Sequence, residues 1–210
     1  MSISHNEFFK PKASRVEAFS DGVFAIIITL LVLEIKIPHL QDTLSNQQAF
    51  NALLALFPKI ISFVLSFIYI AAFWVNHHQF FQLLSSMNRG LMWQNIALLL
   101  CLSFVPFPTA SMGEYPHNAV ALAFFALILT LSGVCFNIMW WYAARHGLFN
   151  ESVTKDYIEK GMRLGLIGPI LYALAAGVAF LIPLAAWFIF IMIPVYYFSP
   201  RDWRGGFRNK

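Results

Sequence analysis

Charged residues are scarce in this sequence. Only 11% of its 210 residues are Asp, Glu, Lys or Arg, whereas 59% are hydrophobic. A water-soluble domain carries about 25% charged residues, which cover its surface. This chain has too few to do so, which excludes an ordinary soluble domain. Its outer surface is therefore expected to meet lipid, as in an integral membrane protein.

Other absences narrow the possible functions. The two cysteines, Cys101 and Cys135, both lie inside apolar segments, so we expect small buried side chains and no disulfide framework. The sequence contains no HExxH or GxSxG motif and no paired acids inside an apolar segment, which argues against an enzyme. We predict no cofactor and no bound metal, because the adjacent residues His77 and His78 would point about 100° apart on a helix.

Long apolar segments with short polar connections make up most of the chain. About 20 mostly apolar residues are needed to span a bilayer. We predict an all-α, polytopic membrane protein with six spans in a single domain, residues 1–210. The first dozen residues have no apolar core of a signal peptide, so the first span is expected to remain in the mature protein. The spans are predicted at about 15–37, 50–84, 90–111, 118–145, 157–182 and 184–198.

The basic residues indicate the orientation. With six spans, both termini lie on one side, and that side holds twelve of the 14 basic residues. Cytoplasmic loops are enriched in Lys and Arg, so both termini are predicted to be cytoplasmic in the plasma membrane. The net charge of +4 could suggest a nucleic-acid partner, but the basic residues lie at the loops and termini, which argues against it. The other side holds Lys36 and Lys59, and the cytoplasmic set is Lys10, Lys12, Arg15, Arg89, Arg145, Lys155, Lys160, Arg163, Arg201, Arg204, Arg208 and Lys210.

The first span, RVEAFSDGVFAIIITLLVLEIKI, carries the unusual chemistry. Arg15, Glu17 and Asp21 lie in its first two turns, and Asp21 is the deepest. An ionisable group at that depth needs a partner, either Arg15 or a polar group of a neighbouring helix. On a helical wheel a narrow stripe contains a single hydroxyl among apolar positions. Periodicity alone does not decide whether this stripe faces lipid, another helix or a pore. The stripe consists of Gly22, Ile26, Thr29, Leu30, Leu33 and Ile37.

The same string resembles the first-helix signature of the transmembrane protein 175 family, the endolysosomal potassium channels and their prokaryotic relatives. The signature is an Arg, then Phe-Ser-Asp-Gly, then an aliphatic run containing a Thr. The length, the helix count and the polar WVNHH end of the second span agree with the prokaryotic branch. The matching residues here are Arg15, Phe19, Ser20, Asp21, Gly22 and Thr29.

The resemblance implies a potassium-permeable cation channel assembled as a homotetramer in the bilayer, with the first helices lining the pore. Aliphatic side chains would form the constriction, and a threonine hydroxyl would give modest selectivity for potassium over sodium. Consistent with this, the sequence has no TVGYG-like filter. The resemblance implies a constriction formed by Ile26, Leu30 and Leu33, with Thr29 responsible for selectivity. It also implies a structural polar network of Arg15, Phe19, Ser20, Asp21, His77 and Asn95. His78 is an alternative to His77 in this network.

Two other functions are compatible with the same segments. A secondary transporter of cations or small solutes would show Gly- or Pro-broken helices near the midplane, and the first span, which is expected to be unbroken, favours the channel. A membrane assembly protein without transport activity is the other alternative. The sequence shows no voltage-sensor helix, calcium loop or ligand domain, so it predicts no gating stimulus.

Overall fold

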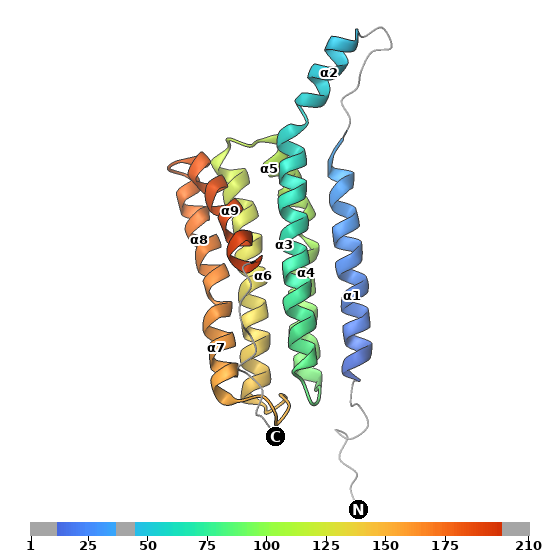
Figure 1. The fold of residues 1–210 in the computed structure, drawn as a ribbon, viewed down its shortest axis with the longest axis vertical. Coiled ribbons are helices and arrows are strands. Elements are labelled where there is room, and N and C mark those ends of the chain that lie inside the picture. The colour runs from blue at the N-terminus through green and yellow to red at the C-terminus, as the bar shows by residue number, and fades with distance from the viewer. Residues whose placement is uncertain (1–11, 37–44, 199–210) are drawn as a thin grey trace, which may run out of the picture.

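The computed structural model describes residues 12–36 and 45–198 as an elongated bundle of roughly parallel and antiparallel helices (Figure 1). In chain order the elements are α1 (Ala13–Leu30), the 3₁₀ helix η1 (Leu31–Glu34), α2 (Asn46–Leu54), α3 (Phe57–Gln82), α4 (Arg89–Ser103), α5 (Pro106–Glu114), α6 (Ala119–Arg145), α7 (Lys155–Gly165), α8 (Ile167–Ala179) and α9 (Pro183–Phe198). The described residues form no strand beyond an isolated bridge between Leu84 and Phe149, so the all-α prediction is confirmed.

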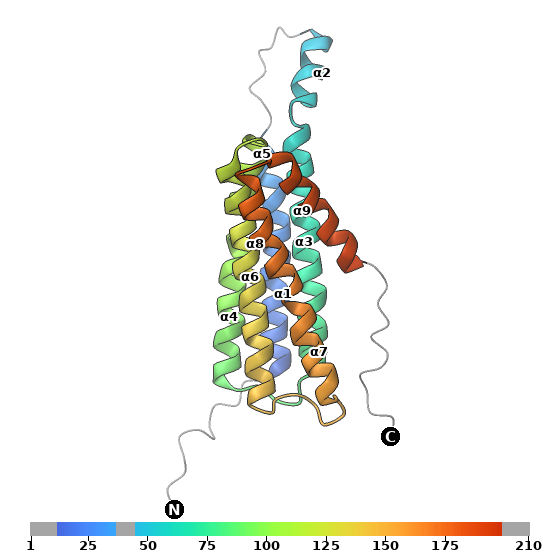
Figure 2. The ribbon, with the colours of Figure 1, turned by 90° about the vertical axis from the view of Figure 1, so that its left-hand side faces the viewer.

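Within residues 12–36 and 45–198, five helical stretches are long and apolar enough to cross a membrane: Ala13–Glu34, Asn46–Gln82, Arg89–Glu114, Ala119–Arg145 and Lys155–Ala179. The predicted sixth span corresponds to α9, which has 16 residues. At 1.5 Å per residue α9 is about 24 Å long, shorter than a hydrocarbon core of about 30 Å. It also slants away from the other helices (Figure 2).

Proline residues divide three of the predicted spans. The span predicted at about 50–84 lies within the helical stretch Asn46–Gln82, but this stretch is divided, because α2 ends at Leu54 and α3 begins at Phe57. Pro58 lies in the first turn of α3, where a missing N–H is harmless, whereas in a continuous helix its ring would clash with the Leu54 carbonyl. The third span divides at Pro106, as its prolines indicated. The fifth divides at Leu166, three residues before Pro169, for the same reason as the second.

Side chains of other helices bind two carbonyls that lack a helical partner because of proline. Pro169 removes the N–H that would bond to Gly165 O, and the Asn137 amide of α6 donates to that carbonyl at 2.8 Å. Pro194 does the same to Phe190 O, which accepts from the Tyr69 hydroxyl of α3 at 2.7 Å. An unpaired carbonyl is costly inside a membrane, so these bonds stabilise the break in the fifth stretch and the proline inside α9.

The loops after α3 and α6 meet at the end of the bundle where α1 begins. Gly147 follows α6 with a φ of 62°, a left-handed conformation that ends the helix. The chain then runs beside the α3–α4 loop, where Leu148 O accepts from Ser85 N and Asn150 N donates to Leu83 O. These bonds hold α3, α4, α6 and α7 together at the end that the charge distribution predicts to be cytoplasmic.

Candidate functional site

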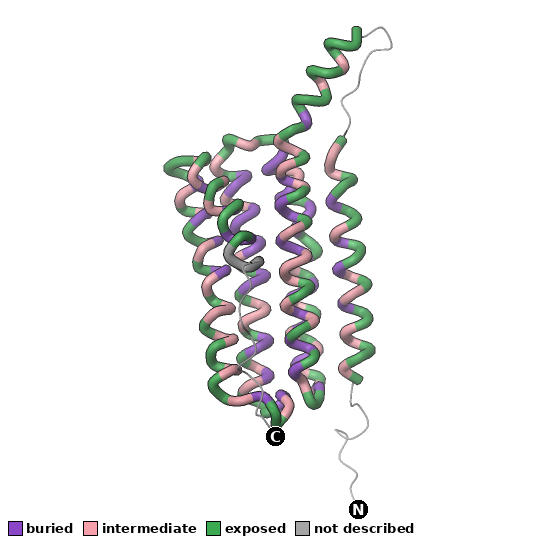
Figure 3. Tube along the Cα trace, in the orientation of Figure 1, coloured by how far each residue is buried: buried purple, intermediate pink, exposed green. Residues whose placement is uncertain are grey.

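One face of α1 packs against α3 and α4 and the other faces outward (Figure 3). The buried residues recur every three to four positions: Ser20, Phe24, Ile27 and Leu31, each at most 2% exposed. A spacing of three and four puts them on one side of a helix. Their contacts therefore fix the rotation of α1 about its own axis.

The opposite face carries the residues that the sequence assigned to a pore. Ile26 is 59% exposed, Leu30 43% and Leu33 66%, and Thr29 is also exposed. A methyl group on Gly22 would meet no atom within 4 Å. This stripe, from Gly22 to Leu33, thus has no partner within the described part of the chain. Ile37, the last predicted member of the stripe, lies outside the described residues.

The upper end of α1 departs from the expected continuous helix. Leu31–Glu34 forms a 3₁₀ turn, in which residues three apart eclipse each other. Leu33 therefore lies almost directly beyond Leu30 along the axis. The Thr29 hydroxyl donates to Ala25 O at 3.0 Å and Ile26 O at 2.9 Å. Its only proton is thus used by the backbone, and its oxygen lone pairs remain available towards the open face.

A buried chain of hydrogen bonds anchors α1 near its first turns. Asn95 of α4 donates from Nδ2 to Ser20 Oγ at 2.9 Å. His77 Nε2 lies 2.7 Å from Asn95 Oδ1, which makes the ring the donor. All three side chains are fully buried, and the Ser20 hydroxyl in turn donates to Val16 O. His77 Nδ1 has no hydrogen-bond partner among the described residues.

A second, more exposed set of contacts joins α1 to α3. Trp74 Nε1 donates to Asp21 Oδ1 at 2.9 Å, and His78 Nδ1 lies 2.9 Å from Glu17 Oε1. Gln82 Nε2 lies 2.8 Å from His78 Nε2, an arrangement consistent with an Nδ1-protonated ring. The Trp74 and His78 rings stack on each other. Asp21 is therefore paired through an indole of a neighbouring helix.

The structure brings together part of the predicted polar network. Ser20, His77 and Asn95 form one chain, and Asp21 lies beside it with Trp74 as partner. The two other predicted members, Arg15 and Phe19, are exposed, and Arg15 forms no ion pair with a described residue. Sequence reasoning connected α1 with the polar end of α3 but missed the particular pairs Asp21–Trp74 and Glu17–His78. Their signal was an i, i+4 spacing on both helices: Glu17 and Asp21 against Trp74, His78 and Gln82.

These features define the class: an all-α, polytopic membrane protein whose first helix is anchored on one face and unpartnered on the other. A family model described as the endosomal/lysosomal potassium channel TMEM175 matches residues 15–106. A protein of Streptomyces collinus named as a potassium channel is 37% identical over 80% of this chain and 83% of its own length. A Chamaesiphon minutus potassium channel is also 37% identical, over 81% and 85%.

A solved structure agrees with this relationship. The crystal structure of a lysosomal potassium-selective channel TMEM175 homologue from Chamaesiphon minutus superposes with a TM-score of 0.75. That chain is 34% identical, and the match covers 88% of this chain and 95% of that one. This protein belongs to the TMEM175 family, which is a family of potassium channels and not a class of enzymes.

Proposed function

We propose that the protein is a homotetrameric, potassium-permeable channel whose pore is lined by α1. One observation carries the proposal: α1 is locked in rotation by a buried face and presents Gly22, Ile26, Thr29 and Leu33 on a face that no other described part of the chain covers. A single chain offers no enclosed path along this face. Several copies arranged around an axis would enclose one, and the relatives named as potassium channels support that assembly.

The exposed residues of α1 differ from an ordinary lipid-facing surface. Arg15 is exposed and lies before the stripe in the first turn of α1. Thr29 adds a hydroxyl to the stripe, and Asp21 lies at the edge of the stripe. Lipid penalises such groups, whereas a water-filled pore solvates them. Ile26, Leu30 and Leu33 from four subunits would form apolar rings that exclude water when narrow and admit it when slightly wider. Thr29 oxygens would replace part of an ion's hydration shell and give modest selectivity for potassium over sodium.

The basic residues support an orientation with both termini in the cytoplasm. Arg15, Arg89, Arg145 and Lys155 lie at the ends of α1, α4, α6 and α7 that meet at one end of the bundle (Figure 1). At the other end, Lys59 forms an ion pair with Glu114. A cytoplasmic excess of Lys and Arg is the rule for membrane proteins, so the first end would face the cytoplasm of a plasma membrane.

A secondary transporter is the second candidate, because carriers often contain broken helices. The fifth stretch divides at Leu166 and α9 contains Pro194. However, the freed carbonyls at these breaks accept from Asn137 and Tyr69, so they are not displayed to a solute. The breaks are therefore better explained as packing features than as a substrate site.

Reconstitution in a planar bilayer separates the two functions. With unequal potassium and sodium on the two sides, a channel gives unitary currents that reverse close to the potassium potential. Saturable flux of potassium without unitary currents would reject the channel and favour a carrier. The mass of the purified assembly in detergent tests the tetramer separately.

A further inference from the structure

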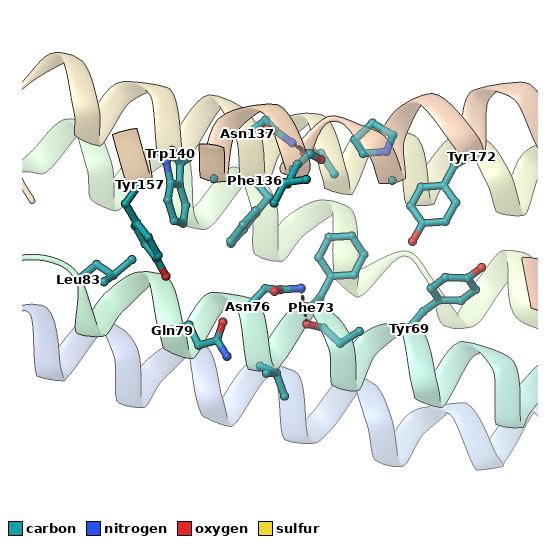
Figure 4. A pocket seen from close by; sticks show the side chains of 18 residues that line it. Tyr69, Phe73, Asn76, Gln79, Leu83, Phe136, Asn137, Trp140, Tyr157 and Tyr172 are labelled. Atoms are coloured by element: carbon teal, nitrogen blue, oxygen red, sulfur yellow. Dashed lines mark hydrogen bonds between the residues drawn. The ribbon is translucent and has the colours of Figure 1, made fainter. Parts of the chain in front are cut away.

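A groove on the far side of α3 from α1 contains a cavity of about 190 Å³ (Figure 4). Residues of α3 form one wall, and residues of α6, α7 and α8 form the other. Glycines let the second wall pack tightly: a methyl group on Gly133 would lie 2.6 Å from Pro169, and one on Gly161 would lie 2.4 Å from Trp140. The wall of α6, α7 and α8 is thus compact, and the cavity lies between it and α3.

The groove runs from the membrane surface towards the bilayer centre. Leu83, just after the end of α3, and Tyr157, in the first turn of α7, line its lower end. Tyr69, fourteen residues before Leu83 and thus about 21 Å away along the helix, lines its upper end. There the hydrogen bond from Tyr69 to Phe190 O ties α3 to α9. Both the length and the direction match those of a lipid acyl chain.

Amide and apolar side chains both line the groove. Asn76, Gln79 and Asn137 supply the amides, and Phe73, Phe136 and Pro169 supply apolar surface to the cavity. Tyr69 and Tyr172 lie at its upper end (Figure 4). Asn76 and Asn137 donate to backbone carbonyls, but the Gln79 amide has no hydrogen-bond partner among the described residues. An unpaired amide in a bilayer costs free energy, and Gln79 lies only one turn from the end of α3. The acceptors that a bilayer supplies at that depth are the ester carbonyls of its lipids.

We propose that this groove is a binding site for one glycerophospholipid. An acyl chain lies between Phe73 and Phe136, and an ester carbonyl accepts a hydrogen bond from Gln79 Nε2. The opposite face of the same stretch of α3 carries Trp74, His77 and His78, which hold α1 through Asp21, Asn95 and Glu17. The lipid would therefore support the helix that positions α1. Its binding does not depend on whether ions pass through the protein.

Photo-crosslinking in bilayers tests the site. The full-length protein is reconstituted with a phosphatidylcholine that carries a diazirine in one acyl chain, and labelled peptides are mapped by mass spectrometry. We expect labelling concentrated on groove residues such as Phe73 and Leu164, above that of the exposed residues Leu184 and Phe188 of α9. Equal labelling of the groove and α9 would overturn the proposal. Absence of label from the groove alone would show that another subunit covers it, and would also overturn the proposal.

Two matched variants sharpen the test. Leu164→Trp places a bulky ring in the groove, and Leu166→Trp makes the same change at an exposed position that does not line it. Groove labelling should fall at least about fivefold in the first and stay unchanged in the second, which also controls for folding. A diether lipid lacks ester carbonyls, so it should label the groove about threefold to tenfold less, the loss expected for one hydrogen bond. Gln79→Leu should abolish that preference; an unchanged ester preference would exclude Gln79 as the donor.

Discussion

The buried chain Ser20–Asn95–His77 gives the most specific quantitative prediction. Asn95→Leu keeps the approximate size of the side chain but removes the one hydrogen-bond partner that the His77 ring has among the described residues, where its Nδ1 is already unpaired. His77→Phe keeps a ring between Phe24 and Phe81, with centroid distances of 5.3 and 4.5 Å in the native structure, but leaves Asn95 Oδ1 unpaired. Each single change thus leaves one buried polar group without its hydrogen-bond partner.

The expected cost follows from the size of such an unpaired group. It is about 1–3 kcal/mol in general and towards the lower end in membrane proteins, so we expect about 1–2 kcal/mol for each single variant. The double variant removes both partners of the His77–Asn95 bond. We therefore expect it to cost about as much as one single variant, which corresponds to a coupling energy of about 1–2 kcal/mol.

Unfolding by SDS in detergent micelles, followed by far-UV circular dichroism, measures these free energies. Thr130→Val is the control, because the Thr130 hydroxyl bonds only to Ala126 O of its own helix. When Thr130→Val is combined with Asn95→Leu, the losses of unfolding free energy from the two changes should be additive. If the losses from the two changes at His77 and Asn95 are also additive, the hydrogen bond does not couple α3 to α4, and the reasoning about this bond is refuted.

Three further predictions concern the pore face and α9. Leu30→Ala should widen the constriction and raise unitary conductance, whereas Leu174→Ala on α8, a comparably exposed leucine far from α1, should not; equal effects would contradict a pore along α1. Thr29→Val should lower the potassium-to-sodium permeability ratio in bi-ionic recordings, and an unchanged ratio would remove the hydroxyl from selectivity. Tyr69→Phe should cost about 1–2 kcal/mol in the same SDS assay, because Phe190 O loses its donor. Adding Pro194→Ala restores a helical N–H and should recover most of that loss; no recovery would contradict this explanation.

The membrane class and the five long apolar stretches could be predicted because they depend on composition over about 20 residues. The breaks near Pro58 and Pro106 also follow from local rules. The division at Leu166 was not predicted, although Pro169 carries the same signal as Pro58 and Pro106. Pro169 frees the Gly165 carbonyl, which then needs Asn137.

The partners of the polar residues could be predicted only in part. The resemblance connected Ser20 and Asp21 with the polar end of the second span, but it left His77 and His78 equivalent. The two differ because adjacent helical residues point about 100° apart. That rotation turns His77 towards Asn95 of α4 and His78 towards Glu17 of α1. Which histidine faces which helix depends on how α3 is placed, and a single sequence does not contain that information.

The face of α1 shows why periodicity alone could not assign a function. Almost every position from Val23 to Leu33 is apolar, so the wheel produces an apolar stripe in any direction. The informative residues are the few polar ones, because each must have a partner. Ser20 is bonded to Asn95, which fixes the inward side, and the Thr29 hydroxyl bonds only to its own helix on the opposite side. Leu31, next to the stripe, is fully buried, so truncating it would open a cavity in the core rather than leave the protein unaffected. If Leu31→Ala were the control for Leu30→Ala, a change in conductance could not be separated from a loss of stability. The control is therefore Leu174→Ala, at an exposed leucine on another helix.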